Sequence, residues 1–232
     1  MTKKILITGA NGQLGHEMRN ALKGNNRFEC IFTDVAELDI CNAEAVKQTI
    51  ADNHIDYIVN CAAYTQVDKA EDNTELCRKI NTDAVENLAR AAADYGARMI
   101  HISTDYVFNG RGYRPYTEDM VPDPQSVYGS TKLEGEKILT DICPESIIIR
   151  TAWLYSPYGN NFVKTMLHLG EEREELSVVA DQIGTPTCAA DLAQAILVIL
   201  QADTFVPGTY YFSDEGVCSW YDFTVTIHRL AG

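Results

Sequence analysis

The fold is decided close to the N-terminus by residues 4–15, which read KILITGANGQLG. The first part, Lys4–Thr8, is a short apolar run with the length of a buried strand, and residues 14–23 then place apolar side chains at helical period. Between the two lies a cluster of glycine and asparagine, which is typical of a tight turn. A strand that passes through glycines into a helix is the first unit of a dinucleotide-binding βαβ fold.

The three glycines of this turn are spaced so that each has a separate physical task. Gly9 permits a sharp backbone turn, Gly12 lets the backbone approach a pyrophosphate, and Gly15 lets the helix pack closely on the sheet. The helix N-terminus then presents free N–H groups and the positive end of its dipole to the phosphates. We therefore predict that these glycines bind a dinucleotide cofactor.

An acidic side chain ends the second predicted strand. Asp34 follows the apolar run 28–33, and an acid at this position can bind the ribose hydroxyls of such a cofactor. Because an acid disfavours a 2′-phosphate, we expect NADH to be favoured over NADPH, with either accepted. The alternative is that Asp34 only caps the loop in which it lies.

Strand and helix signals alternate along the chain, and the alternation loosens after Arg150. Short apolar strands with helices between them indicate a parallel sheet covered on both faces. The predicted strands are 28–33, 56–60, 98–103, 146–150 and 176–180, with a further loop and strand within 203–213. The predicted helices are 42–51, a long and possibly broken segment over 68–95, then 127–141, 162–172, 191–201 and a last helix from Trp220.

These elements predict an α/β fold, a Rossmann doubly wound parallel sheet with a small substrate-binding lobe. We expect residues 1–155 and about 176–203 to form the dinucleotide-binding domain. The smaller lobe is expected from about 156–175 and 204–232.

Composition narrows the class of protein further. The chain has 232 residues and a formal net charge of -14, so it lacks the basic footprint of a nucleic-acid binder. Its seven cysteines are odd in number and lack CxxC spacing, which disfavours disulfides and a zinc site and fits a reducing cytosol. No apolar run at the N-terminus is long enough for a signal peptide or a membrane span. We expect a cytoplasmic protein that binds neither nucleic acid nor membrane, and the scattered histidines identify no metal site.

A tyrosine and a lysine form the candidate catalytic pair. Tyr128 and Lys132 are one helical turn apart in a predicted helix, so their side chains share a face. A free tyrosine has a pKa near ~10, and a nearby ammonium lowers that pKa toward working pH. Ser103 and Thr104 end the fourth strand, where an open α/β sheet binds ligands. The alternatives are a surface helix with a solvated lysine and an ordinary strand-end turn.

Together with the TGxxGxxG turn, several motifs resemble the extended branch of the short-chain dehydrogenase/reductase superfamily, and in combination the dTDP-4-dehydrorhamnose reductase family. The resemblance covers essentially the whole chain. The motifs are Thr104-Asp105-Tyr106-Val107-Phe108, Tyr128-Gly-x-x-Lys132, Asn60-Cys-Ala-Ala63, Val67-Asp68-Lys69-Ala70-Glu71, Arg150-Thr-x-Trp153 and Gly159-Asn-Asn-Phe162.

The resemblance implies an enzyme that uses NADPH or NADH to reduce the C4 ketone of dTDP-4-dehydro-6-deoxy-L-mannose to dTDP-L-rhamnose. It implies that Tyr128 protonates the nascent alkoxide, that Lys132 tunes Tyr128 and holds the nicotinamide ribose, and that Thr104 binds the sugar. The cofactor-contacting positions that it implies are Gly12, Gln13, Leu14, Asp34, Asp39, Ile40, Ala63, Tyr64 and Thr65. The substrate-contacting positions are Thr104, Asp105 and Trp153, and for Trp153 an ordinary core role is the alternative.

Members of that family run on for some tens of residues past Gly232, so the resemblance implies a lobe that is incomplete at its C-terminus. Some members use Mg²⁺ at a dimer contact, which allows a metal and a homodimer here without identifying ligands. Two other functions are left open by the sequence. The same fold occurs in the non-catalytic regulatory subunit of methionine adenosyltransferase, and in epimerases and dehydratases that act on other nucleotide sugars.

Overall fold

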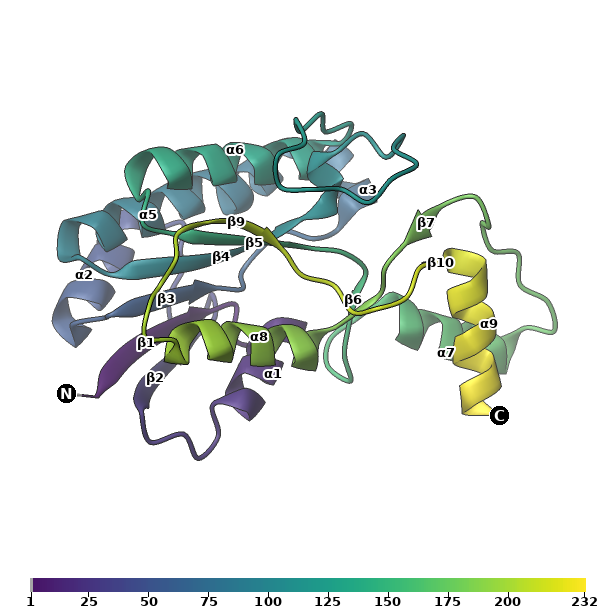
Figure 1. Ribbon diagram of the computed structural model, residues 1–232, viewed down its shortest axis with the longest axis horizontal. Helices are drawn as coiled ribbons and strands as arrows, with labels where there is room; N and C mark the ends of the chain where they lie inside the picture. The colour runs from purple at the N-terminus through teal and green to yellow at the C-terminus, as the bar shows by residue number, and fades with distance from the viewer. Residues whose placement is uncertain (1) are drawn as a thin grey trace.

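The computed structural model describes residues 2–232 and is built around a six-stranded parallel sheet (Figure 1). The strand order is β2-β1-β3-β4-β5-β9. The strands are β1 (Lys3–Thr8), β2 (Phe28–Thr33), β3 (Tyr57–Asn60), β4 (Arg98–Thr104), β5 (Ile147–Thr151) and β9 (Gly208–Tyr211). The predicted doubly wound α/β fold is confirmed.

Helices cover both faces of this sheet (Figure 1). One face carries α2 (Ala43–Asn53), α5 (Ala84–Tyr95) and α6 (Val127–Ile142), and the other carries α1 (Gln13–Ala21) and α8 (Ala189–Gln201). Strand side chains alternate between the two cores. Leu6 and Ile58 pack with the first set of helices, whereas Ile5, Ile7 and Val59 pack with the second. No helix among residues 2–232 is both long and apolar enough to cross a bilayer.

The strand order contains a point where the direction of winding reverses. From β1 the chain moves outward to β2 and then returns to β3 on the opposite side of β1. The connections that leave the carboxyl ends of β1 and β3 therefore diverge onto opposite faces and leave a crevice between them, which is where open α/β sheets bind ligands. The glycine turn follows β1, so it lies at this reversal.

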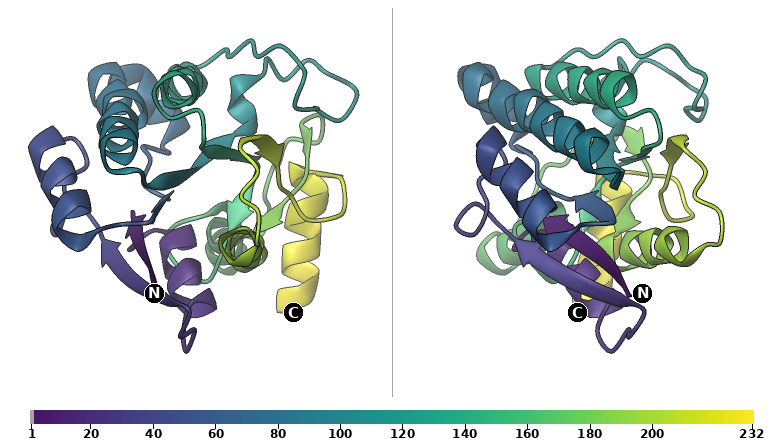
Figure 2. Two further views of the ribbon diagram at one scale, coloured as in Figure 1. Left: turned by 60° about the vertical axis from the view of Figure 1, so that its left-hand side comes forward. Right: turned by 90° about the vertical axis from the view of Figure 1, so that its left-hand side faces the viewer.

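A smaller lobe sits beside the carboxyl edge of the sheet, as Figures 1 and 2 show. It contains α7 (Phe162–Glu172) and α9 (Trp220–Ala231), which pack together. Its short strands β7 (Ile183–Gly184) and β10 (Cys218–Ser219) are antiparallel. A second short pair, β6 (Leu154–Tyr155) and β8 (Thr187–Cys188), is parallel and links lobe and sheet.

The structure corrects the predicted boundary of this lobe at two places. Gly208–Tyr211 was expected in the lobe, but it pairs with Ile147–Arg150 and extends the main sheet. The exposed edge of β5 offers unpaired backbone groups, and this segment satisfies them. The strand predicted over 176–180 does not form; the first pairing after α7 is Ile183–Gly184, and its partner belongs to the lobe.

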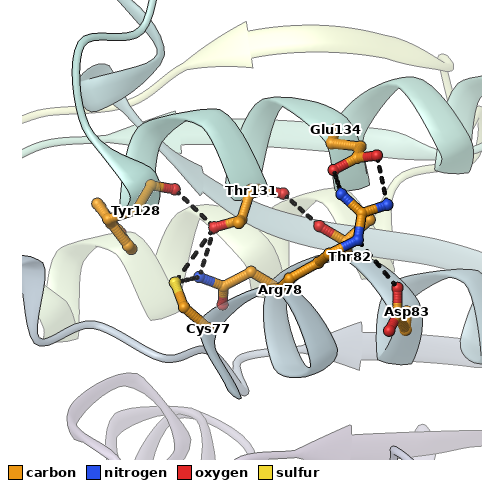
Figure 3. Close-up of polar contacts among 8 residues, drawn as sticks. Cys77, Arg78, Thr82, Asp83, Tyr128, Thr131 and Glu134 are labelled. Carbon is orange, nitrogen blue, oxygen red and sulfur yellow. Dashed lines mark hydrogen bonds and ion pairs between the residues drawn. The ribbon is translucent and has the colours of Figure 1, made fainter. Parts of the chain in front are cut away.

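The long helix predicted over 68–95 is broken into four pieces. They are α3 (Val67–Asp72), α4 (Thr74–Arg78), a π-helical segment (Lys79–Asp83) and α5. The π-helical segment packs against α6, and Figure 3 shows the side chains that join them. From this segment the Thr82 hydroxyl donates to the Thr131 carbonyl at 2.9 Å. From the preceding α4, Cys77 Sγ lies 3.3 Å from the Thr131 hydroxyl and Arg78 forms an ion pair with Glu134. A π-helical turn inside a helix is frequent at functional sites.

Close packing of α6 depends on two glycines. A Cβ on Gly129 would lie 2.1 Å from the carbonyl oxygen of Tyr106, and a Cβ on Gly135 would lie 2.3 Å from that of Asn81. Both obstacles are backbone atoms, so they cannot move aside as a flexible side chain can. These contacts set how deeply α6, and with it Tyr128 and Lys132, enters the molecule.

Gly135→Ala is therefore expected to destabilise the protein. In an unobstructed helix interior the same change is stabilising by about 1 kcal/mol, but here overpacking should lower the free energy of unfolding by about 1–3 kcal/mol. Urea denaturation measures the difference. Ser130→Ala, at an exposed position on the same helix, is the control and should stay within about 0.5 kcal/mol of the parent. A gain in stability for Gly135→Ala would contradict the close contact.

Candidate active site at the carboxyl edge of the sheet

The glycine turn is pressed against the loop that follows β3. Gly9 has φ +64°, in the left-handed region, and a Cβ there would lie 2.6 Å from the backbone nitrogen of Ala62. A Cβ on Gly15 would lie 2.3 Å from the carbonyl oxygen of Gly9. A side chain on Gly9 would push the ends of β1 and β3 apart, and a side chain on Gly15 would push α1 away from the turn, so glycine is needed at both positions.

The N-terminus of α1 has the features of a phosphate site. Its N-cap residue is Gly12, whose lack of a side chain leaves the first N–H groups of the helix without a side-chain acceptor. The Gly12 amide donates to the Gly9 carbonyl at 3.0 Å. These groups fit a pyrophosphate, since a dinucleotide supplies the acceptors that free N–H groups need.

Gln13 and Leu14 were both expected to contact the cofactor, but the side chain of each has a partner within the protein. The Gln13 amide accepts a hydrogen bond from Asn161 at 2.9 Å and so ties the glycine turn to the segment before α7. Leu14 is 4% exposed and packs in the core. Its side chain is thus used in the core, and its backbone N–H, in the first turn of α1, is the group left for a phosphate.

The Asp34 carboxylate spans the ends of β1 and β2. It accepts hydrogen bonds from the backbone N–H groups of Asn11 at 2.9 Å and Val35 at 2.8 Å. The residue is half-buried. Asp34 therefore caps the turn and also lies where it can bind a ribose, so the two roles considered for it from the sequence are compatible.

Asp39 and Ile40 lie further along the same connection. The Asp39 carboxylate is exposed and accepts from the Cys41 N–H at 2.9 Å. Ile40 is buried, and its carbonyl accepts from the Asn87 amide at 3.0 Å. The Asp39 carboxylate and the Ile40 backbone carbonyl thus hold the loop that leads into α2.

The loop after β3 is held by a residue that the sequence did not single out. Asn81, in the π-helical segment, accepts from the Tyr64 N–H at 2.9 Å and donates to the Tyr64 carbonyl at 3.1 Å. This pair of bonds fixes the backbone between Ala63 and Thr65, which are half-buried and exposed respectively. The π-helical geometry that points Asn81 at this loop has no signature in a helical sequence pattern.

Tyr128, Thr104 and Lys132 come together at the carboxyl end of β4. Thr104 ends that strand, and its hydroxyl lies 3.2 Å from the Asp105 carboxylate. The Tyr128 ring stands edge-on to that of Tyr106, with 5.5 Å between centroids. Tyr128 opens α6, whose N-cap Ser126 accepts from the Gly129 N–H at 3.1 Å. The Thr104 side chain is close enough to the Tyr128 phenol to influence it, so the two hydroxyl groups lie near one another at this edge of the sheet.

The pKa of Tyr128 does not follow the expectation from the sequence. Burial raises it above the ordinary value of 10.0, while the Thr104 side chain acts in the opposite direction. Lys132 does not lower it here, because its Nζ lies 2.6 Å from the Ile102 carbonyl and 3.2 Å from His101 Nε2. Burial also lowers the pKa of Lys132 from 10.5 to about 8. Desolvation thus outweighs the attraction between the two groups that the spacing predicts.

Asp105 and Trp153 also lie at the carboxyl edge of the sheet, after β4 and β5 respectively. Burial raises the pKa of Asp105 from 3.8 to about 6, and the hydrogen bond from Thr104 opposes this. Trp153 has φ +49°, a strained conformation for a bulky residue. Its ring stacks on Trp220 with 3.5 Å between centroids, and its carbonyl accepts from the Thr187 N–H at 3.2 Å. Trp153 is thus held between the sheet and the lobe rather than within a core.

Comparison with known proteins places these features in a family. The model described as "RmlD substrate binding domain" matches residues 3–232. A dTDP-4-dehydrorhamnose reductase from Aggregatibacter actinomycetemcomitans is 43% identical over 228 residues, which are 97% of this chain and 78% of that protein. The structure of a dTDP-4-dehydrorhamnose reductase from Clostridium acetobutylicum superposes with a TM-score of 0.95 at 51% identity, covering 99% of this chain and 80% of that one.

A third relative has a cofactor in its structure. The dTDP-4-dehydrorhamnose reductase from Bacillus anthracis, solved in complex with NADP, superposes with a TM-score of 0.95 at 43% identity. The match covers 100% of this chain and 81% of that one. The chain and these relatives therefore share the sheet and the lobe described above.

Asp105→Asn should change the pH dependence of stability. Because the folded pKa of about 6 exceeds the unfolded 3.8, the contribution of this group is complete below the lower value and is lost as pH rises through the higher one. The variant does not titrate. Its unfolding free energy relative to the parent should rise by about 2–3 kcal/mol between about pH 4 and pH 7, measured by urea denaturation. Asp72→Asn, at an exposed carboxylate on α3, is the control, and a pH-independent difference for Asp105→Asn would refute the assignment.

Proposed function

The chain belongs to the RmlD substrate binding domain family, and from this membership we propose that it reduces a nucleotide-linked keto sugar with NADPH or NADH. The reaction is reduction of the C4 ketone of dTDP-4-dehydro-6-deoxy-L-mannose to dTDP-L-rhamnose, which accords with the names of its relatives. The observation that carries the proposal is the meeting of Tyr128 and Thr104 at the carboxyl end of β4, on the same edge of the sheet as the glycine turn after β1.

The cofactor is assigned to the crevice between the ends of β1 and β3. Gly9, Gly12 and Gly15 leave room for its pyrophosphate against the N-terminus of α1. Further contacts are proposed from Gln13, the Leu14 backbone, Asp34, Asp39, Ile40, Ala63, Tyr64, Thr65, Tyr128 and Lys132. When bound, a reduced nicotinamide supplies the hydride for the ketone.

Tyr128 is proposed as the proton donor to the oxygen at C4. A general acid must carry its proton before the reaction, and burial favours this state by raising the pKa of the phenol. Thr104 is proposed to hydrogen-bond the same oxygen, since its hydroxyl lies beside the phenol. These two groups together orient the carbonyl and stabilise the charge that develops on it.

Lys132 is proposed to hold the nicotinamide ribose. Its Nζ is fixed at the end of β4 by the Ile102 carbonyl, at 2.6 Å. A fixed amine at this depth can donate to ribose hydroxyls and keep the reactive ring close to Tyr128. The proposed role is thus one of binding and orientation.

The lobe, without Gly208–Tyr211, which belongs to the sheet, is proposed to hold the sugar nucleotide. Asp105 and Trp153 are the proposed contacts from the sheet side. The strained backbone of Trp153 and its stack on Trp220 fix the indole at the junction of the two parts. A constrained aromatic is a suitable surface for a sugar ring because little entropy is lost on contact.

Two other functions are less well supported. A regulatory subunit does not require Tyr128 and Thr104 to lie together at the end of β4. An epimerase or dehydratase leaves no net change in its cofactor, so steady oxidation of NADH and a product heavier by two hydrogens would separate reduction from both. No three His, Cys, Asp or Glu side chains group together as metal ligands within 2–232, and the proposal names neither Mg²⁺ ligands nor a dimer contact.

Tyr128→Phe should lower kcat by about 10²–10⁴, because it removes the proton donor and keeps the ring. The assay is NADH oxidation with dTDP-4-dehydro-6-deoxy-L-mannose. Tyr113→Phe is the matched control, since Tyr113 is 90% exposed, and it should behave as the parent. Turnover near the parent rate in Tyr128→Phe would remove this residue from the reaction.

The preference for NADH over NADPH is proposed to rest on Asp34. Its carboxylate disfavours a 2′-phosphate, so Asp34→Ser should lower the ratio of kcat/KM for NADH to that for NADPH by about tenfold or more, or about 1.4 kcal/mol. Asp52→Asn removes the same charge at the far end of α2, where the residue is exposed, and should leave the ratio unchanged. An unaltered ratio in Asp34→Ser would assign the carboxylate to its hydrogen bonds in the turn alone.

A further inference from the structure

A chain of buried polar side chains runs through the sheet and ends at Lys132. The Thr8 hydroxyl donates to Asn60 Oδ1 at 2.7 Å, Asn60 Nδ2 lies 3.0 Å from His101 Nδ1, and His101 Nε2 lies 3.2 Å from Lys132 Nζ. The four side chains come from β1, β3, β4 and α6. None is more than 1% exposed, so water does not supply alternative partners.

The orientation of the Asn60 amide is fixed by the backbone. The N–H of Ala62 donates to Asn60 Oδ1 at 3.2 Å. A backbone N–H can only donate, so the amide oxygen must face it and the amide NH₂ must face His101. Turning the amide over would place two donors against one another at this point.

This orientation determines where His101 carries its proton. Asn60 Nδ2 can only donate, so His101 Nδ1 must accept, and in a neutral imidazole the proton then lies on Nε2. The imidazole is neutral because burial lowers the pKa of His101 well below 6.5. His101 therefore presents an N–H to Lys132.

An N–H facing Lys132 has a consequence for the charge of the lysine. An ammonium has three donors and no acceptor, so it cannot accept from His101 Nε2. A neutral amine accepts this hydrogen bond with its lone pair and still donates to the Ile102 carbonyl, at 2.6 Å. Every hydrogen bond in the chain is satisfied only when Lys132 is neutral.

The other groups around Lys132 leave this arrangement intact. Glu136, one turn further along α6, faces it but uses both carboxylate oxygens on Arg150 of β5, at 2.9 and 2.6 Å. Cys77 of α4 is hydrogen-bonded to Thr131 and Asn81, and Tyr128 of α6 lies near Thr104. Glu136 and Cys77 favour the charged lysine, and burial outweighs both.

We propose that His101 is a positioning residue that sets the charge of Lys132: the fixed Asn60 amide holds the imidazole as its Nε2–H tautomer, which favours the neutral amine. The inference rests on the proposed function because it concerns the lysine assigned to the nicotinamide ribose. Its consequence is that protonation of Lys132 breaks the contact with His101, so a ligand that accepts a hydrogen bond from the ammonium shifts the lysine toward its charged form.

The first test reads the tautomer directly in the unaltered protein. Long-range ¹H–¹⁵N spectra of protein labelled at histidine nitrogens distinguish a protonated ring nitrogen from a bare one, and His101→Phe assigns the signals. The proton should lie on Nε2 from about pH 5 to 8, without formation of an imidazolium. A proton on Nδ1, or a doubly protonated ring in this range, overturns the proposal whether or not any variant folds.

The second test reverses the donor and acceptor roles along this series of hydrogen bonds. Asn60→Asp replaces the NH₂ donor by an acceptor, so the His101 proton should move to Nδ1 and Nε2 should accept from an ammonium. The titration midpoint of the Lys132 Cε signal, followed by ¹³C NMR with Lys132→Met for assignment, should rise by about one pH unit or more. Thr8→Val is the control, because Asn60 Oδ1 keeps its Ala62 donor, and it should change neither the tautomer nor the midpoint.

The double variant Asn60→Asp/His101→Phe separates the hydrogen-bonded chain from the direct effect of a new carboxylate. Most of the rise in the midpoint should be lost in it, and a rise that persists in full would refute transmission through His101. These readouts do not depend on turnover. A protein with the Nε2–H tautomer but no NADH oxidation would contradict the proposed function and support this inference. An active protein with the Nδ1–H tautomer would support the proposed function and contradict this inference.

Discussion

The close approach of the glycine turn to the loop after β3 is the constraint on which the rest of the structure depends. Gly9 lies so near the backbone of Ala62 that a Cβ at this position would keep the ends of β1 and β3 apart. The Ala62 N–H is in turn held by Asn60, whose amide begins the buried path to His101 and Lys132. The turn that shapes the phosphate site and the chain that fixes the lysine therefore share one contact.

Helix α6 is the second element positioned by close backbone contact. Two glycines let it approach Tyr106 and Asn81, and Thr131 and Glu134 bind it to Cys77 and Arg78 of α4 (Figure 3). Backbone-to-backbone packing leaves little freedom, so Tyr128 is oriented by the helix as a whole. Catalytic groups carried on rigid elements keep their geometry better than groups on loops.

Burial, more than pairing of charges, controls the electrostatics of the site. It raises the pKa of Tyr128 and Asp105 and lowers that of Lys132. All three shifts favour the uncharged form, as expected where a charge loses its water without gaining an equal partner. Arg150 and Glu136 are buried nearby as an ion pair joined by two hydrogen bonds. Burial thus weakens the charge of the groups at the centre of the site, within a protein of net charge -14.

The sequence by itself determined the doubly wound sheet, the glycine turn and the pairing of Tyr128 with Lys132 on one helical face. These follow from local spacing, since strand length, glycine geometry and the helical repeat are short-range properties. Only the tertiary structure decided that Gly208–Tyr211 joins the sheet, that Asn81 holds the loop at Tyr64, and that Lys132 turns toward His101. Each of these depends on which backbone groups lack partners and on how much water is excluded, and both are settled only when distant segments pack together.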